Sequence, residues 1–141
     1  MSDLLALANQ VMAAQPFSVL VGAEITQFGQ GKAELSIELC EKHRQQHGFV
    51  HGGVLSYAAD NALTFAAGSA LGPAVVTAEF KINYLRPALG EKLIARASVI
   101  HAGKTQAVCC CEVFCVKQNT DYLCAIAQGT VNVLSNPNSS Q

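Results

Sequence analysis

The sequence predicts an α+β fold, in which one antiparallel sheet curls around a single long helix and a further helix lies at the N-terminus. Three features carry this prediction. The longest candidate helix, residues 53–71, is apolar almost throughout. Strand-like segments follow it, and residues 17–40 before it alternate between apolar and polar side chains. A helix that is apolar on most of its circumference is buried only if a sheet wraps around it.

The N-terminal part of the chain is expected to form a helix, a strand pair and a loop. Apolar residues recur at helical spacing over residues 3–14, Ser2 is the candidate N-cap, and Pro16 ends the helix. Residues 17–40 have the period-two pattern of two strands, and glycines interrupt this pattern. Residues 41–50 are polar and are expected to form the loop that enters the long helix.

Four strands are expected after the long helix. The first alternates so that Thr77 lies on its polar face, opposite the face that carries Phe80. The other three are joined by short turns, one of them at Ala102 and Gly103, which predicts an antiparallel meander. The expected strands are residues 75–87, 91–103, 104–118 and 122–134.

Composition predicts a single domain over residues 1–141, with residues 135–141 as a frayed tail. Charged residues make up 13% of the chain, roughly half the usual share of about 25%. We therefore expect part of the surface to lie in subunit contacts, so that the protein is at least a homodimer. The net charge of -1 argues against a nucleic-acid partner, because no basic stripe is present to neutralise phosphates.

The N-terminus and the cysteines predict the compartment. Asp3 is acidic and no Lys or Arg precedes Lys32, so the positive flank of a signal peptide is missing. No apolar run approaches the ~20 residues that span a bilayer, so no membrane association is expected. The six cysteines are interpreted as reduced, buried thiols. The expectation is a soluble, cytoplasmic protein.

Residues 47–62, HGFVHGGVLSYAADNA, contain the strongest candidate site. Gly52 and Gly53 stand where the loop enters the helix, and backbone N–H groups there can stabilise an oxyanion. Asp60 lies eight residues after Gly52 in an apolar stretch, where an unpaired acid is costly unless it has a function. On one helix the two residues are separated by about 12 Å. They can meet at one reacting group only if two chains pack antiparallel.

These residues resemble a known family, the hotdog-fold thioesterases of the phenylacetate-pathway type. That family has the motif Asn-x-x-Gly-x-x-His-Gly-Gly followed by an acid on the central helix, and here it is matched by residues 45–60. The segments VTAEFKINYLRPA (76–88) and AGKTQAVCCCEVF (102–114) resemble the strand and the hairpin that follow in the family. The resemblance covers roughly residues 20–134.

The resemblance implies a hotdog fold and hydrolysis of an acyl-CoA to a carboxylic acid and CoA. The Gly52 N–H would polarise the thioester carbonyl, with Gly53 beside it at the substrate, and His51 would shape the loop. Asp60 of the opposite subunit would activate water as a general base or act as the nucleophile. Thr77 would help to hold the water. A homotetramer is implied, and no cofactor, since CoA is part of the substrate.

Three further positions belong to this prediction. Arg86 and Lys104 are candidates to meet the CoA phosphates, with ordinary surface charge as the alternative. Gln45 stands where the family has Asn; it keeps the amide but is one methylene longer. This departure leaves a non-catalytic acyl-CoA-binding module as an alternative. A hotdog hydratase acting on enoyl or hydroxyacyl thioesters is the other, although its usual arrangement of His with an acid differs from HGG with a mid-helix acid.

A metal site is not expected. His43, His47 and His51 recur at every fourth position, but Gly48 interrupts any helix that would align them. The cysteines lack CxxC spacing.

Overall fold

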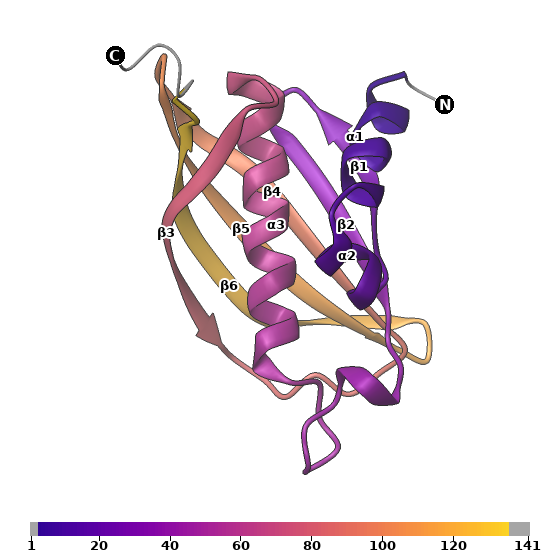
Figure 1. The fold of residues 1–141 in the computed structure, drawn as a ribbon. Helices are drawn as coiled ribbons and strands as arrows, with labels where there is room; N and C mark the ends of the chain where they lie inside the picture. The colour runs from indigo at the N-terminus through magenta and orange to yellow at the C-terminus, as the bar shows by residue number, and fades with distance from the viewer. Residues whose placement is uncertain (1–2, 136–141) are drawn as a thin grey trace.

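A computed structural model of the chain describes residues 3–135. The predicted architecture is confirmed, with a six-stranded antiparallel sheet curled around one long helix and the N-terminal helices on the open side (Figure 1). The helices are α1 (Asp3–Ala13), α2 (Pro16–Val21) and α3 (Gly52–Leu71), with a 3-10 turn η1 (Glu41–His43) before α3. The strands are β1 (Ala23–Gly29), β2 (Lys32–Glu38), β3 (Val75–Tyr84), β4 (Lys92–Ala102), β5 (Gln106–Lys117) and β6 (Thr120–Val133). Their order across the sheet is β1-β2-β4-β5-β6-β3.

Small side chains let α3 lie close against the sheet. The residues that α3 turns towards the strands are mostly alanines, and they have no exposed surface. Leu63 is the largest fully buried side chain of the helix, and it packs among inward-facing residues of the strands such as Leu35 and Val113. The fully buried alanines are Ala58, Ala59, Ala62, Ala66 and Ala67. No helix in residues 3–135 is long and apolar enough to cross a membrane.

The segment that follows α1 differs from the prediction. Residues 16–21 form the helix α2 instead of the start of a strand, and β1 begins at Ala23. Pro16 opens this helix, because proline is tolerated in a first turn where the missing N–H has no acceptor. Gly22 closes it in the left-handed region, with φ 87°. The predicted N-cap Ser2 and most of the predicted tail lie outside the described residues.

The predicted face of Thr77 is also wrong. The pairing of β3 with β6 shifts between Thr77 and Glu79, where Ala78 is the extra residue of a β-bulge. Because the bulge reverses the alternation, Thr77 lies on the same inward side as Phe80, while Ala78 is exposed. A strict period of two had placed Thr77 on the outer face.

The two edges of the sheet differ. At the β1 edge, the Asn9 side chain of α1 accepts from the Ile25 N–H (2.9 Å) and donates to the Ile25 carbonyl (2.8 Å), as a neighbouring strand would. At the other edge, no strand within residues 3–135 pairs with the outer side of β3. An open edge is a surface on which another chain can add a strand.

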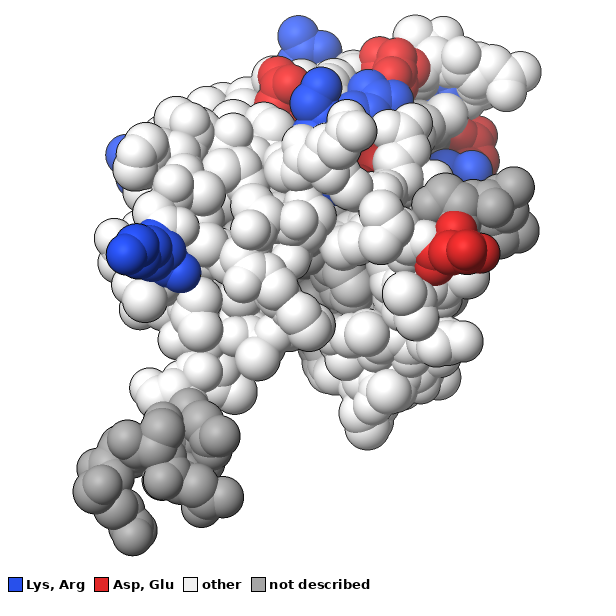
Figure 2. Space-filling model, turned by 90° about the horizontal axis from the view of Figure 1, so that it is seen from above, with Lys and Arg blue, Asp and Glu red and all other residues white. Residues whose placement is uncertain are grey.

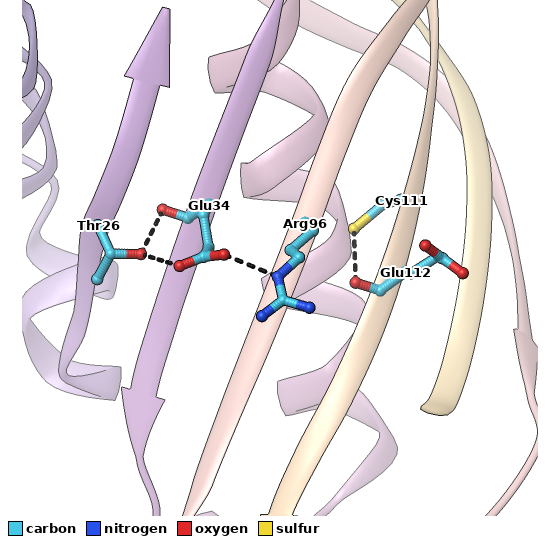
Figure 3. A network of polar contacts seen from close by, with 5 residues as sticks. All are labelled: Thr26, Glu34, Arg96, Cys111 and Glu112. Carbon is cyan, nitrogen blue, oxygen red and sulfur yellow. Dashed lines mark hydrogen bonds and ion pairs between the residues drawn. The ribbon is translucent and has the colours of Figure 1, made fainter. Parts of the chain in front are cut away.

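Charged side chains collect on the outer face of the sheet. Glu34 accepts from the Thr26 hydroxyl (2.7 Å) and pairs with Arg96 (2.8 Å), and Glu112 stands opposite Arg96 in the register of β4 and β5 (Figure 3). Seen from above, most of the charged side chains lie towards one edge, a few stand apart from it, and most of the remaining surface is uncharged (Figure 2).

Candidate active site

His51 prepares the first turn of α3. It is the N-cap residue, and its ring Nδ1 accepts the Gly53 N–H at 2.8 Å. A Cβ on Gly53 would lie 2.9 Å from that ring nitrogen, so the cap requires glycine at this position. Gly52, at the first helical position, has no intrahelical acceptor for its N–H, and none is found among residues 3–135. The cap therefore leaves the Gly52 N–H as the donor that can meet a substrate.

The loop before α3 is held in place by backbone contacts. The His51 N–H donates to the His43 carbonyl (2.8 Å), and the Val50 N–H donates to the Ala88 carbonyl (3.0 Å). His43 is buried, and its Nε2 lies 2.7 Å from the Val21 carbonyl. These contacts fix the position of the His51 cap, so the predicted loop has a defined conformation.

Tyr84 covers the other side of Gly52. It comes from the end of β3, and its hydroxyl donates to the Gly52 carbonyl at 3.1 Å. A Cβ on Gly52 would lie 3.4 Å from the Tyr84 ring. The sequence does not point to Tyr84, because nothing in the strand pattern distinguishes it from an ordinary apolar residue.

Asp60 is held by two threonines. The Thr77 hydroxyl donates to Asp60 Oδ1 at 2.7 Å, and the Thr64 hydroxyl lies 2.8 Å both from the Asp60 carbonyl and from the Thr77 hydroxyl. Asp60 is half-buried on the side of α3 that faces β3. The structure thus joins the predicted residues Asp60 and Thr77 and adds Thr64, which could have been found from its position one turn after Asp60.

The structure does not bring Asp60 and Gly52 together within one chain. Both lie on the uninterrupted helix α3, eight residues apart, which corresponds to about 12 Å along the axis. Gly52 lies beside Tyr84 at the end of β3, whereas Asp60 lies beside Thr77 near its beginning. Each chain therefore carries two separate half-sites along the same edge of the sheet.

A cavity of about 310 Å³ adjoins Gly52 and brings three predicted residues together. Gln45, Gly52 and Arg86 line it, together with Tyr84. The Gln45 side-chain oxygen accepts the His47 N–H, so its amide nitrogen is the group left to meet a ligand. Arg86 is exposed at the rim.

Lys104 lies at the other end of the molecule. It belongs to the hairpin between β4 and β5, where the next residues pair with the end of β6 opposite Val76. Val76 and Tyr84 are separated along β3 by about 26 Å at ~3.3 Å per residue. Lys104 and Arg86 of one chain therefore do not meet the same phosphate group.

The cysteines and Tyr57 are further titratable side chains, and each is buried or hydrogen-bonded within the chain. Burial raises the pKa of Cys109 to about 11 and those of Cys111 and Cys124 to about 12, so these thiols stay protonated. Burial also raises the pKa of Tyr57, whose hydroxyl donates to Ser18 at 2.6 Å. Residues 3–135 contain no group of three or more His, Cys, Asp or Glu that could hold a metal ion.

The fold is that of a hotdog-fold thioester hydrolase. The sequence matches the Thioesterase superfamily over residues 47–132, more than half of the chain, and the protein belongs to this family. The chain is 32% identical over 113 residues to a putative esterase of Archaeoglobus fulgidus, covering 79% of this chain and 71% of that protein. It is 33% identical over 101 residues to the acyl-coenzyme A thioesterase PaaI of Escherichia coli, covering 71% of each chain.

The solved structures agree with these sequence matches. A thioesterase family protein from Silicibacter pomeroyi superposes with a TM-score of 0.87 at 33% identity, covering 92% of this chain and 96% of that one. The PaaI protein of Escherichia coli superposes with a TM-score of 0.81 at 25% identity, covering 94% of each chain. The predicted fold, family and class of enzyme are thereby confirmed.

Proposed function

We propose that the protein hydrolyses acyl-CoA thioesters at a site shared by two chains, with the Gly52 N–H from one chain and Asp60 from the other. The observation that carries this proposal is the pair of half-sites on α3, each incomplete and about 12 Å apart. The acyl-CoA substrate is supported by the similarity to PaaI, which is an acyl-CoA thioesterase.

The open edge of β3 supports a particular dimer. If two β3 strands pair antiparallel about a twofold axis at Lys81, Thr77 of each chain stands opposite Tyr84 of the other, because the bulge takes Ala78 out of the pairing. Thr77 holds Asp60, and Tyr84 covers Gly52. This pairing therefore moves each carboxylate towards the N–H group of the other chain. The tetramer implied by the family resemblance would need a second interface, and light scattering distinguishes the two states.

The chemistry needs no cofactor. Asp60 takes a proton from a water molecule held near Thr77, and the water oxygen attacks the thioester carbonyl carbon. Charge develops on the carbonyl oxygen, where the Gly52 N–H stabilises it. Collapse of this intermediate breaks the C–S bond, and the CoA thiolate takes up a proton. In the alternative route, Asp60 attacks the carbonyl carbon itself, the C–S bond breaks and the CoA thiolate leaves and takes up a proton, and water then hydrolyses the mixed anhydride to the carboxylic acid and free Asp60.

The same pairing gives Lys104 a role. It brings the Lys104 hairpin of one chain towards the Arg86 rim of the other, so that two cations from different chains flank the substrate entrance. Arg86→Gln should raise KM for an acyl-CoA but not for the matching acyl-pantetheine, which lacks the nucleotide phosphates.

We place the reaction in the cytoplasm, a prediction supported by six cysteines that are all free.

Two variants test the shared site. Asp60→Asn removes the base, and Gly52→Pro removes the N–H at a helical position where proline is tolerated. Each alone should lower kcat/KM by about 100- to 1000-fold. Gly52→Ala keeps the N–H, and the difference between the two Gly52 variants measures the donor.

Mixing the two inactive variants distinguishes a shared site from a single-chain site. After subunit exchange, each mixed dimer has one site with both native groups and one with neither, so about a quarter of the activity should return. If exchange is verified by mass spectrometry and no activity returns, the two-chain site is wrong. If wild type releases no CoA from any acyl-CoA, the proposed substrate class is wrong.

A further inference from the structure

A groove on the open side of α3 is a candidate binding site for the acyl group of the substrate. It has a volume of about 350 Å³ and lies between α1 and the C-terminal half of α3. None of its lining residues is charged. Its main lining residues are Leu4, Leu7 and Val11 from α1, and Thr64, Phe65 and Gly68 from α3.

The groove begins beside the catalytic carboxylate. Thr64 lines it, and the Thr64 hydroxyl lies 2.8 Å from that of Thr77, which donates to Asp60. Gln15 lines the same end, since its side-chain oxygen accepts from Asn61, the residue after Asp60. From this end the groove follows α3 towards its C-terminus.

Resting on the thioesterase function proposed above, we infer that this groove binds the acyl chain and selects straight aliphatic thioesters of about twelve carbons. The part of the groove wall within α1, from Leu4 to Ala13, spans about 14 Å at ~1.5 Å per residue, and Gln15 continues the wall beyond the end of the helix. An extended alkyl chain with bonds of ~1.5 Å advances about 1.25 Å per carbon. An aromatic acyl group would fill only the end nearest Asp60.

The lining chemistry fits an alkyl chain and not the CoA part of the substrate. Uncharged walls offer no partner for phosphates, whereas Arg86 stands at the separate cavity beside Gly52. The hydroxyls of Thr64 and Ser69 that face this region are already bonded within the protein. The groove is therefore suited to apolar carbon along its length.

Gly68 offers a way to shorten the groove. A Cβ at this position would lie 3.7 Å from Val75 Cγ2, an ordinary contact, so a side chain can start at Gly68 without moving the backbone. Gly68 lies eight residues after Asp60, or about 12 Å along the helix. A side chain there would obstruct long acyl chains and leave room for short ones.

The test is a chain-length profile of kcat/KM for butanoyl-, octanoyl-, dodecanoyl-, hexadecanoyl- and phenylacetyl-CoA. Wild type should gain about fourfold per methylene up to dodecanoyl-CoA and gain nothing beyond it. Gly68→Val should lower the ratio of dodecanoyl to butanoyl kcat/KM at least tenfold. Ala70→Val also introduces a valine, at an exposed position on α3 outside the groove, and should leave the profile unchanged. A flat profile, or a profile whose shape Gly68→Val leaves intact, would overturn the inference.

A binding measurement separates this inference from the proposed function. The probes are S-butyl-CoA and S-dodecyl-CoA, thioethers that cannot be hydrolysed, titrated by calorimetry. The dodecyl probe should bind wild type at least 100-fold more tightly than the butyl probe, and Gly68→Val should remove most of that gain. This result without thioester hydrolysis would reject the catalytic proposal and keep the groove. Hydrolysis of thioesters together with equal binding of both probes would keep the catalytic proposal and reject the groove.

Discussion

The face of α3 that packs on the sheet and the face that stays open differ in size and polarity of side chains. The sheet face carries alanines and Leu63, all without exposed surface. The open face carries Tyr57, Asp60 and Thr64, each half-buried and hydrogen-bonded through its side chain, and Asp60 and Thr64 lie where this face meets the edge strand β3. One helix thus holds the core together and presents a hydrogen-bonded carboxylate, because its two faces meet different surroundings.

A carboxylate moved to the sheet face should have the largest effect. Ala62→Asp buries a charge at a position with no exposed surface and no partner, which should cost more than about 4 kcal/mol and prevent folding. Ala70→Asp makes the same change at an exposed position on the same helix and is the control. Circular dichroism and urea unfolding measure both; a stably folded Ala62→Asp would contradict the contrast between the faces.

Truncation on the sheet face should lower stability without changing the chemistry. Leu63→Ala leaves a cavity in the core and should cost about 3 kcal/mol in the free energy of unfolding. The kcat/KM of the folded fraction should stay within a factor of two, because Leu63 does not face Asp60. Urea unfolding and thioesterase assays at low temperature check the two parts separately. An equal loss in kcat/KM would mean that the core and the site are coupled.

Loss of a hydroxyl beside Asp60 should lower the activity and leave the stability nearly unchanged. Thr77→Val removes the donor to Asp60 Oδ1 and should lower kcat/KM about tenfold, or about 1.4 kcal/mol. Thr130→Val is a matched control, because the Thr130 hydroxyl also donates to a carboxylate, Glu79, but on the outer face (2.6 Å). Equal activity of the two variants would remove Thr77 from the site.

The hydrogen bonds that tie α2 to the open face should contribute a smaller amount. The Tyr57 hydroxyl donates to Ser18 and accepts from Asn61 (2.9 Å). Tyr57→Phe should lower the free energy of unfolding by about 1 kcal/mol, because buried partners lose a hydrogen bond. Thermal unfolding measures this loss. An unchanged Tm would show that water replaces the hydroxyl.

The thiols should show the smallest effect near neutral pH. At pH 8 a thiol reagent should label exposed Cys40 first and half-exposed Cys110 more slowly, while buried thiols such as Cys111 stay unlabelled until unfolding. Burial raises the pKa of Cys111 from 9.0 to about 12, so the protonated thiol is favoured in the fold. Its contribution to stability is therefore complete below pH 9 and is lost as the pH rises towards 12. Rapid labelling of all six thiols at pH 8 would contradict this burial.

Local patterns were enough for the elements that depend on few neighbours. The glycine pair, the helix that follows it and the position of Asp60 could all be predicted, since a helix start and its spacing are properties of a short segment. The short helix α2 was missed because a six-residue apolar segment has too few turns to show a helical period. Its start at Pro16 was interpreted as an end, since proline is compatible with both.

The sequence by itself determined the order of the strands and the two longer helices, the apolar helix at the centre of the sheet and the separation of about 12 Å between Gly52 and Asp60. The tertiary structure alone decided which side chains meet. The bulge at Ala78 exists because β3 pairs with β6 in a shifted register, and this turned Thr77 inward to Asp60. Pairing with a distant strand sets such a register, and no periodicity within ten residues records it.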